Sequence, residues 1–156
     1  MSQSLKRVQA ALQAAGVQAE ILGFEQDTRT AAQAAGMAGC ALDQIVKSIV
    51  FRGETSGHVA LFLTAGGNQV SPDKASAVAG EALGKADAAL IRAETGFAIG
   101  GVSPVGHLSP VRAFLDPRLM TFARIWAAAG TPRHIFAISP TDLVRITGAE
   151  VADFTV

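Results

Sequence analysis

The segment 95–107 constrains the fold of this chain most strongly, because it concentrates glycine and also contains a proline. It holds four of the sixteen glycines within thirteen residues, together with Pro104. Each glycine inside a helix costs about 1 kcal/mol relative to alanine, and a proline lacks the N–H that a central strand needs. The segment is therefore predicted to be a shaped loop whose backbone approaches something closely, with a tight turn between two buried elements as the alternative.

The spacing of these glycines excludes the common nucleotide-binding fingerprints. They stand at positions 96, 100, 101 and 106, so G-x-G-x-x-G is absent, and no Gly-Lys-Ser/Thr follows. What remains is a pair of glycines followed by a rigid proline. Such a loop suits a carbonyl or phosphate oxygen held by main-chain N–H donors.

Composition limits the class of protein. The 156 residues are 49% hydrophobic and 17% charged, which predicts one folded domain with one core over residues 1–156. The formal net charge is zero, so a nucleic-acid partner must be met by a local patch of cations. With one cysteine, no secretory signal and no apolar run long enough to span a bilayer, we expect a cytoplasmic protein without a membrane partner.

Apolar periodicity and capping residues give a coarse secondary structure. Helices are predicted over residues 2–15, 31–35, 72–83, 87–95 and 140–146. Strands are predicted over residues 17–24, 45–51, 58–64, 112–115, 122–128 and 135–138. Because several strands are joined as hairpins, the fold is predicted to be α+β with a mixed, largely antiparallel sheet.

Lys47 is the most unusual residue outside the glycine-rich loop. It lies in the apolar, β-branched run 45–51, and a lysine is rarely buried without a partner. One interpretation is an ammonium held at a pocket to bind a phosphate or a carboxyl-derived oxygen. The other is a lysine on an edge strand that faces water.

Other chemistry-bearing residues form no familiar site. His58, His107 and His134 are far apart, and neither His-x-x-x-His nor Cys-x-x-Cys occurs, so no metal site is expected. His107 has the best case for a role, as a general base or a pocket wall, because it follows the glycine-rich loop. Cys40 lacks a nucleophile signature, and no Gly-x-Ser-x-Gly elbow is present.

Several of these features occur together in one known family. They are Thr30-Ala31-Ala32, Lys47 on its strand, Thr95-Gly96-Phe97 running into Gly100-Gly101-Val102-Ser103-Pro104-Val105-Gly106, and Gly130 followed by Ile138-Ser139-Pro140-Thr141-Asp142-Leu143. In their order and spacing the chain resembles the YbaK/EbsC family of prolyl-tRNA-synthetase-associated domains, the free-standing aminoacyl-tRNA editing deacylases. The resemblance covers roughly residues 4–154.

The resemblance implies a fold, an activity and a partner. The mixed sheet would wrap into a partly closed barrel flanked by helices. The protein would hydrolyse the ester of a mischarged tRNA in trans, without metal or cofactor and with assistance from the substrate itself. Its partners would be the 3′ acceptor end of the tRNA and an aminoacyl-tRNA synthetase, and the protein would be a monomer or a homodimer. A few cations would form the local patch, drawn from Lys47, Arg52, Lys74, Arg92, Arg112, Arg124 and Arg133.

The resemblance also implies the site. Lys47 would help to hold the 3′-terminal adenosine or the ester, and the N–H of Gly101 would hold the aminoacyl carbonyl. The residues expected in catalysis are Lys47, Gly100, Gly101, Ser103 and Pro104. Those expected to bind substrate are Thr30, Ile45, Phe97, Val102, Gly106, His107 and Gly130.

The amino acid removed stays open between alanine, cysteine, serine, threonine and another small residue. The cysteinyl-specific branch of the family has a Ser-Gly-Gly run and an aspartate where residues 127–135 read AAAGTPRHI, so cysteine is the least expected. Two other functions also stay open. One is a catalytically idle module that binds an aminoacyl-adenosine-like ligand or a synthetase, and the other is a hydrolase of small esters.

Overall fold

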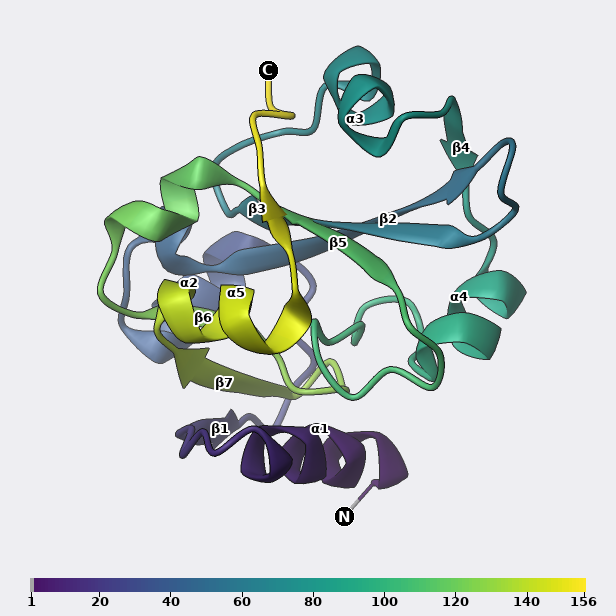
Figure 1. The fold of residues 1–156 in the computed structure, drawn as a ribbon. Coiled ribbons are helices and arrows are strands. Elements are labelled where there is room, and N and C mark those ends of the chain that lie inside the picture. The colour runs from purple at the N-terminus through teal and green to yellow at the C-terminus, as the bar shows by residue number, and fades with distance from the viewer. Residues whose placement is uncertain (1) are drawn as a thin grey trace.

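The fold contains two sheets with helices packed around them (Figure 1), seen in a computed structural model that describes residues 2–156. The smaller sheet is antiparallel, in the order β1-β7-β6. Its strands are β1 (Ile21–Gly23), β7 (His134–Ile138) and β6 (Ile125–Ala128).

The larger sheet has the order β4-β2-β3-β5-β8 and is mixed. The ladders of β2 with β3 and β4 are antiparallel, whereas β3 with β5 and β5 with β8 are parallel. Its strands are β4 (Leu83–Lys85), β2 (Val46–Gly53), β3 (Val59–Ala65), β5 (Arg112–Leu115) and β8 (Glu150–Val151). The predicted α+β class is confirmed.

The two sheets meet at one parallel bridge between Ile45 and Trp126. Apart from this bridge they are separate ladders within residues 2–156, so no closed barrel is found there. The partial closure that the resemblance implies stays a prediction, as does the single domain over residues 1–156.

Each α-helix begins at a side chain that accepts a hydrogen bond from the N–H three residues on, which satisfies one of the free donors of the first turn. The helices are α1 (Gln3–Ala14), α2 (Ala31–Ala38), α3 (Pro72–Ala79), α4 (Ala88–Thr95) and α5 (Pro140–Thr147), with caps Ser2, Thr30, Ser71, Asp87 and Ser139. Two short 3₁₀ helices are η1 (Leu42–Gln44) and η2 (Pro117–Thr121). No helix among the described residues has the length and apolar character to cross a membrane.

Two predicted helix ends were wrong. Helix α2 passes through Gly36 and stops at Gly39, which has a φ of 70°. Helix α3 stops at Gly80, with a φ of 75°, so that Leu83, where the helix was predicted to end, instead begins strand β4. A glycine ends a helix when the chain needs the left-handed conformation there, and the sequence does not show which glycine takes it.

Two strand starts differ as well. Strand β1 begins at Ile21, because the N–H of Val17 donates to Leu12 O and extends the end of α1. Strand β6 begins at Ile125, because the chain first completes η2 and a bend.

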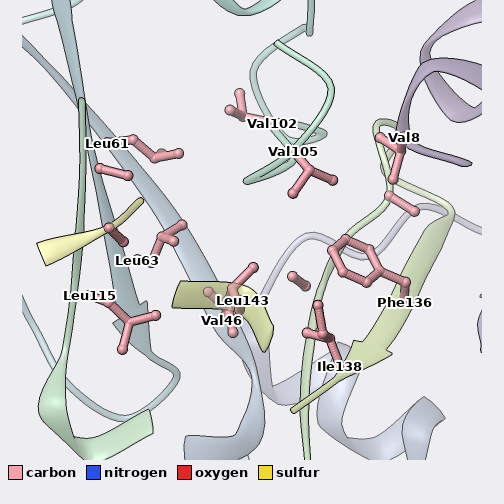
Figure 2. Packing of buried hydrophobic residues seen from close by; sticks show 14 of the residues in the cluster. Val8, Val46, Leu61, Leu63, Val102, Val105, Leu115, Phe136, Ile138 and Leu143 are labelled. Atoms are coloured by element: carbon pink, nitrogen blue, oxygen red, sulfur yellow. The ribbon is translucent and has the colours of Figure 1, made fainter. Parts of the chain in front are cut away.

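The core lies on both faces of β3, whose seven residues are all buried, as its apolar sequence predicted. On one face, Phe62 stacks on Phe114 and meets Phe154 edge-on, both at 4.9 Å between ring centroids, beneath α3. On the other face the main cluster fills the space between the sheets. Figure 2 shows Val102 and Val105 of the glycine-rich loop extending into it from above. The loop is therefore anchored by its own apolar side chains.

Candidate functional site

A cleft of about 820 Å³ opens between α2, β2, β6 and the glycine-rich loop. Its wall brings together several residues that are distant in sequence and that were predicted to form the site. They are Thr30, Ile45, Lys47, Gly100 and Val102. The apolar end of the cleft is formed by Ala31, Ala34, Ile45, Trp126 and Ile135.

Lys47 is half-buried in the cleft wall, and its ammonium donates to the main-chain oxygen of Asn68. The side chain of Asn68 is itself held by Asp116, to which it donates at 2.9 Å. Asp116 is only 2% exposed and also accepts from the N–H of Ala65 at 3.1 Å and of Arg118 at 2.9 Å. A buried carboxylate therefore shapes the turn that orients Lys47, and two ammonium donors remain for a ligand.

Asp43 lies behind this turn and strengthens it. Its carboxylate accepts from the N–H of Gly67 at 2.8 Å and from Arg118 at 2.9 Å. The hydrogen bond from Arg118 lowers the pKa of Asp43, and the positive charge of Lys47 contributes in the same direction. The carboxylate thus stays ionised near the ammonium.

The floor of the cleft is an open strand edge. Strand β2 pairs with β4 only from Phe51 onward, and the bridge to β6 is at Ile45, so 46–50 have no strand partner on that side. The N–H of Gly53 donates to His58 O, on the β3 side. Because main-chain groups alternate in an antiparallel ladder, Ser48 and Val50 turn their N–H and C=O groups toward the cleft.

The glycine-rich loop supplies further donors, although not the one predicted. The N–H of Gly101 donates to Ala98 O at 3.0 Å, so it is not free to hold a carbonyl. Within residues 2–156 no hydrogen bond is found for the N–H groups of Gly100 and Val102, both of which line the cleft. In this structure the N–H that was predicted to hold the carbonyl is thus engaged within the loop, and the open N–H groups at the cleft belong to its two neighbours.

Gly101 has a different structural reason to be glycine. A Cβ there would meet the main chain of Thr131, with Cα at 3.0 Å. The loop thus rests directly on the turn after β6. Thr28 is tied to the same turn, since its N–H and hydroxyl both donate to Pro132 O, at 2.8 and 3.0 Å. These contacts fix the cleft walls on either side.

The remaining predicted residues do not line the cleft. Phe97 and Ser103 are fully buried, and Gly130 is buried where a Cβ would meet Ser4 O at 2.8 Å. In this structure these residues pack beneath the loop, and their direct roles stay predictions. Three others line a separate hollow of about 450 Å³ on the far side of the loop, namely Pro104, Gly106 and His107.

His107 does not face the cleft, so the general-base hypothesis is not supported. Its Nε2 lies 2.6 Å from Ser103 O, which makes this nitrogen the donor. Burial lowers the pKa of His107, and the nearby charge of Arg7 adds to that effect. The ring is therefore a neutral wall of the second hollow at pH 7.

Charge on the rim was missed by sequence reasoning. Arg29 and Lys85 are exposed and line the cleft, and neither forms an ion pair within residues 2–156. Most members of the patch expected from the sequence are instead paired with carboxylates: Arg52, Lys74, Arg112, Arg124 and Arg133. Lys85 lies on strand β4, which was not predicted, between the predicted helices 72–83 and 87–95. No sequence signal marks Arg29.

Among the described residues, one carboxylate lies in the cleft wall, that of Asp27. Asp27 pairs with Arg133 at 2.8 Å. No group of three or more His, Cys, Asp or Glu side chains in the described chain is placed to hold a metal ion. The cleft thus combines three cations, main-chain donors and an apolar end, a set of groups that suits a ligand with both negative charge and an apolar part.

Comparisons with known proteins identify the family of this chain. Residues 25–146 match the model of the aminoacyl-tRNA editing domain. The chain belongs to this family, so the predicted membership is confirmed.

Relatives match over most of their lengths. One solved structure, of a protein proposed to be a trans-editing enzyme for prolyl-tRNA synthetase, is 44% identical, with a TM-score of 0.93 over 100% of this chain and 99% of that one. The hypothetical protein APE2540 is 27% identical, with a TM-score of 0.87 over 96% and 99% of the two chains. The uncharacterized protein YwhH of Bacillus subtilis (strain 168) is 29% identical over 132 residues, which are 85% of this chain and 83% of YwhH.

Proposed function

We propose that this protein hydrolyses, in trans and in the cytoplasm, the ester that joins a small amino acid to the wrong tRNA. The observation that carries the proposal is the cleft, where the ammonium of Lys47 and the free N–H groups of Gly100 and Val102 line the same hollow. An ester carbonyl that develops negative charge needs such donors.

The rim cations fit the rest of the substrate. Arg29 and Lys85 are free of carboxylate partners in the described chain and line the cleft. A single-stranded acceptor end brings phosphates to this rim, and a few local cations suffice even when net charge is zero. Lys47 lies deeper, where it contacts the terminal adenosine or the ester.

Within residues 2–156, the one carboxylate that lines the cleft, Asp27, is held by Arg133, and His107 lies in the separate hollow. We therefore assign proton transfer to a hydroxyl of the substrate. Water adds to the carbonyl carbon while the free ribose hydroxyl accepts the proton of the water and passes its own proton to the ribose oxygen of the ester. The ester C–O bond then breaks, the ribose oxygen leaves as a hydroxyl, and the amino acid is released as a carboxylate with loss of one proton.

The apolar end of the cleft is the part that would receive the side chain of the amino acid. Ala31 and Ala34 of α2 face Ile45, Trp126 and Ile135 in one cluster. This end suits a small side chain such as that of alanine, cysteine, serine or threonine. The 44%-identical relative is proposed to act for prolyl-tRNA synthetase, so tRNA mischarged by that synthetase is the first substrate to test, with the synthetase as the expected partner.

The test is a deacylation panel on tRNAs charged with alanine, cysteine, serine, threonine and proline. The matched variants are Lys47→Ala and Lys74→Ala, since Lys74 is an exposed lysine paired with Asp153 outside the cleft. We expect loss of one ester with the native protein and with Lys74→Ala, and at least about a hundredfold slower loss with Lys47→Ala. No loss of any ester by folded native protein would overturn the proposal and favour an idle binding module.

A second arm tests the partner. Arg29→Gln and Lys85→Gln should each raise KM for charged tRNA and reduce its salt dependence by about one phosphate contact. Neither change should alter hydrolysis of an aminoacyl-adenosine ester that lacks the other nucleotides. Equal effects on both substrates would show that these cations do not hold the phosphates.

A further inference from the structure

One arginine outside the cleft joins the two ends of the glycine-rich loop. Nε of Arg7 donates to Gly106 O at 3.3 Å, and its Nη2 donates to Gly96 O at 2.7 Å. The same guanidinium lies 4.7 Å from the ring centroid of Phe97. Arg7 comes from α1, which is distant in sequence from all three residues.

The loop has few other main-chain contacts to define its shape. Its neck is closed by hydrogen bonds from Leu108 N to Thr95 O at 3.3 Å and from Ser109 N to Glu94 O at 3.0 Å. Inside the neck, the described residues show one hydrogen bond between main-chain groups, from Gly101 to Ala98. Three more join main chain to side chain over short spans: Phe97 N to Thr95 Oγ1, Val105 N to Ser103 Oγ, and His107 Nε2 to Ser103 O. A planar guanidinium with a fixed fork of donors is therefore a major constraint on the separation of the loop ends.

Glycine at both ends lets Arg7 reach the backbone. A Cβ at Gly96 would lie 2.5 Å from Nη2 of Arg7, and a Cβ at Gly106 would lie 3.2 Å from the main-chain oxygen of Arg7. Both glycines have positive φ, 82° and 80°, which other residues rarely adopt. The sequence of the loop thus fits this particular contact with α1.

We propose that Arg7 is a positioning residue, which holds the ends of the segment 96–106 and thereby aims the free N–H groups of Gly100 and Val102 into the cleft. Arg7 does not line the cleft itself, so it acts through the loop. The catalytic consequence rests on the proposed function, whereas the effect on loop order does not.

The test compares Arg7→Gln and Arg7→Lys with the control Lys6→Gln, which changes an exposed neighbour on the same helix. Misplacing a donor by about 1 Å costs up to about a hundredfold in rate. We expect Arg7→Gln to lower kcat about 10- to 100-fold with KM within about twofold, and Arg7→Lys to fall between it and the native protein, because an ammonium cannot reproduce the fork. Lys6→Gln should match the native protein.

Amide hydrogen exchange supplies the readout that a general loss of stability would not reproduce. In Arg7→Gln the hydrogen-bonded N–H groups of Gly101, Val105 and Leu108 should exchange at least about tenfold faster, while those of β3 keep the native rate. Equal acceleration in β3 would mean a global effect and would overturn the proposal. Unchanged loop exchange would overturn it too, and so would a native kcat in Arg7→Gln.

The exchange experiment also separates this inference from the proposed function. If the native protein hydrolyses no ester, the deacylase proposal fails, and exchange of the loop in Arg7→Gln alone decides whether Arg7 positions it. If the native protein is active and Arg7→Gln loosens the loop without lowering kcat, the positioning role is refuted while the deacylase proposal stands.

Discussion

Ser48→Ala should stabilise the protein, although it removes a polar group from the cleft wall. The hydroxyl of Ser48 is buried on β2, and no hydrogen-bond partner is found for it within residues 2–156. A buried hydroxyl without a partner costs about 1–3 kcal/mol. Alanine keeps the Cβ and removes that cost.

Two smaller effects oppose the gain. Alanine is a poorer strand residue than serine by a few tenths of a kcal/mol, and the contacts of one oxygen atom are lost at about 0.1–0.2 kcal/mol each. The net expected change in the free energy of unfolding is therefore about +1 kcal/mol. For a chain of this size it corresponds to a rise in Tm of about 2–4 °C.

Thr64→Val is the matched control, because Thr64 is buried on the adjacent strand β3 and its hydroxyl does have a partner. It donates to Phe62 O at 3.0 Å. Valine keeps the shape and loses the bond, so about 1 kcal/mol of stability should be lost. Denaturant unfolding of both variants should give shifts of opposite sign with equal m-values.

A destabilised Ser48→Ala, with Thr64→Val destabilised as expected, would refute the reasoning, because it would mean that the Ser48 hydroxyl is satisfied in the native protein. We also expect Ser48→Ala to slow ester hydrolysis, since an unsatisfied polar group beside a cleft is a typical compromise between stability and function.

Three further predictions follow from single contacts. Gly101→Ala should destabilise the protein by about 1–3 kcal/mol and slow hydrolysis, because its Cβ would meet Thr131 Cα at 3.0 Å; native stability and rate in that variant would contradict it. Asp116→Asn should lower the free energy of unfolding in denaturant by about 2–3 kcal/mol and raise KM, because the new NH₂ group would face N–H donors that now donate to the carboxylate. A KM equal to that of the native protein would show that Asp116 does not act on the orientation of Lys47. Burial lowers the pKa of His107, so the imidazole binds a proton more readily in the unfolded chain than in the folded one. The stability contributed by neutral His107 should therefore be full above about pH 6.5 and fall as the pH drops below it. In His107→Gln the decrease of Tm with falling pH should be smaller.

The sequence predicted those elements whose signals are local. Helix α1 and helix α5 have a capping serine, an apolar stripe and a closing glycine within one window. The glycine-rich loop was predicted because glycine and proline exclude both helix and strand there. Strands β2 and β3 were predicted from their β-branched residues, and the structure pairs them over residues 46–52 and 59–65.

The site was predictable only in part, because its members are brought together by contacts between distant segments. Lys47 was predicted from its apolar neighbours in sequence. Asp116 was predicted only as the start of a turn, because its burial depends on contacts with distant segments. Which loop N–H groups are free also depends on the fold. The N–H of Gly101 donates to Ala98 O, and the spacing of the glycines does not indicate this hydrogen bond. Likewise, Arg29 and Lys85 stand out at the cleft rim because, within residues 2–156, most cations of the expected patch form ion pairs with carboxylates.

The most direct measurement of the central claim, that this cleft holds the aminoacyl ester, is an amide-resolved NMR titration. The ligand is 3′-aminoacylamino-adenosine carrying the amino acid selected in the deacylation panel, or alanine if none is selected, with an amide in place of the ester. We expect saturating ligand to shift and protect the N–H groups of Gly100 and Val102, and Lys47→Ala to weaken binding. Shifts confined to the separate hollow at His107, with unperturbed Gly100 and Val102, would contradict it.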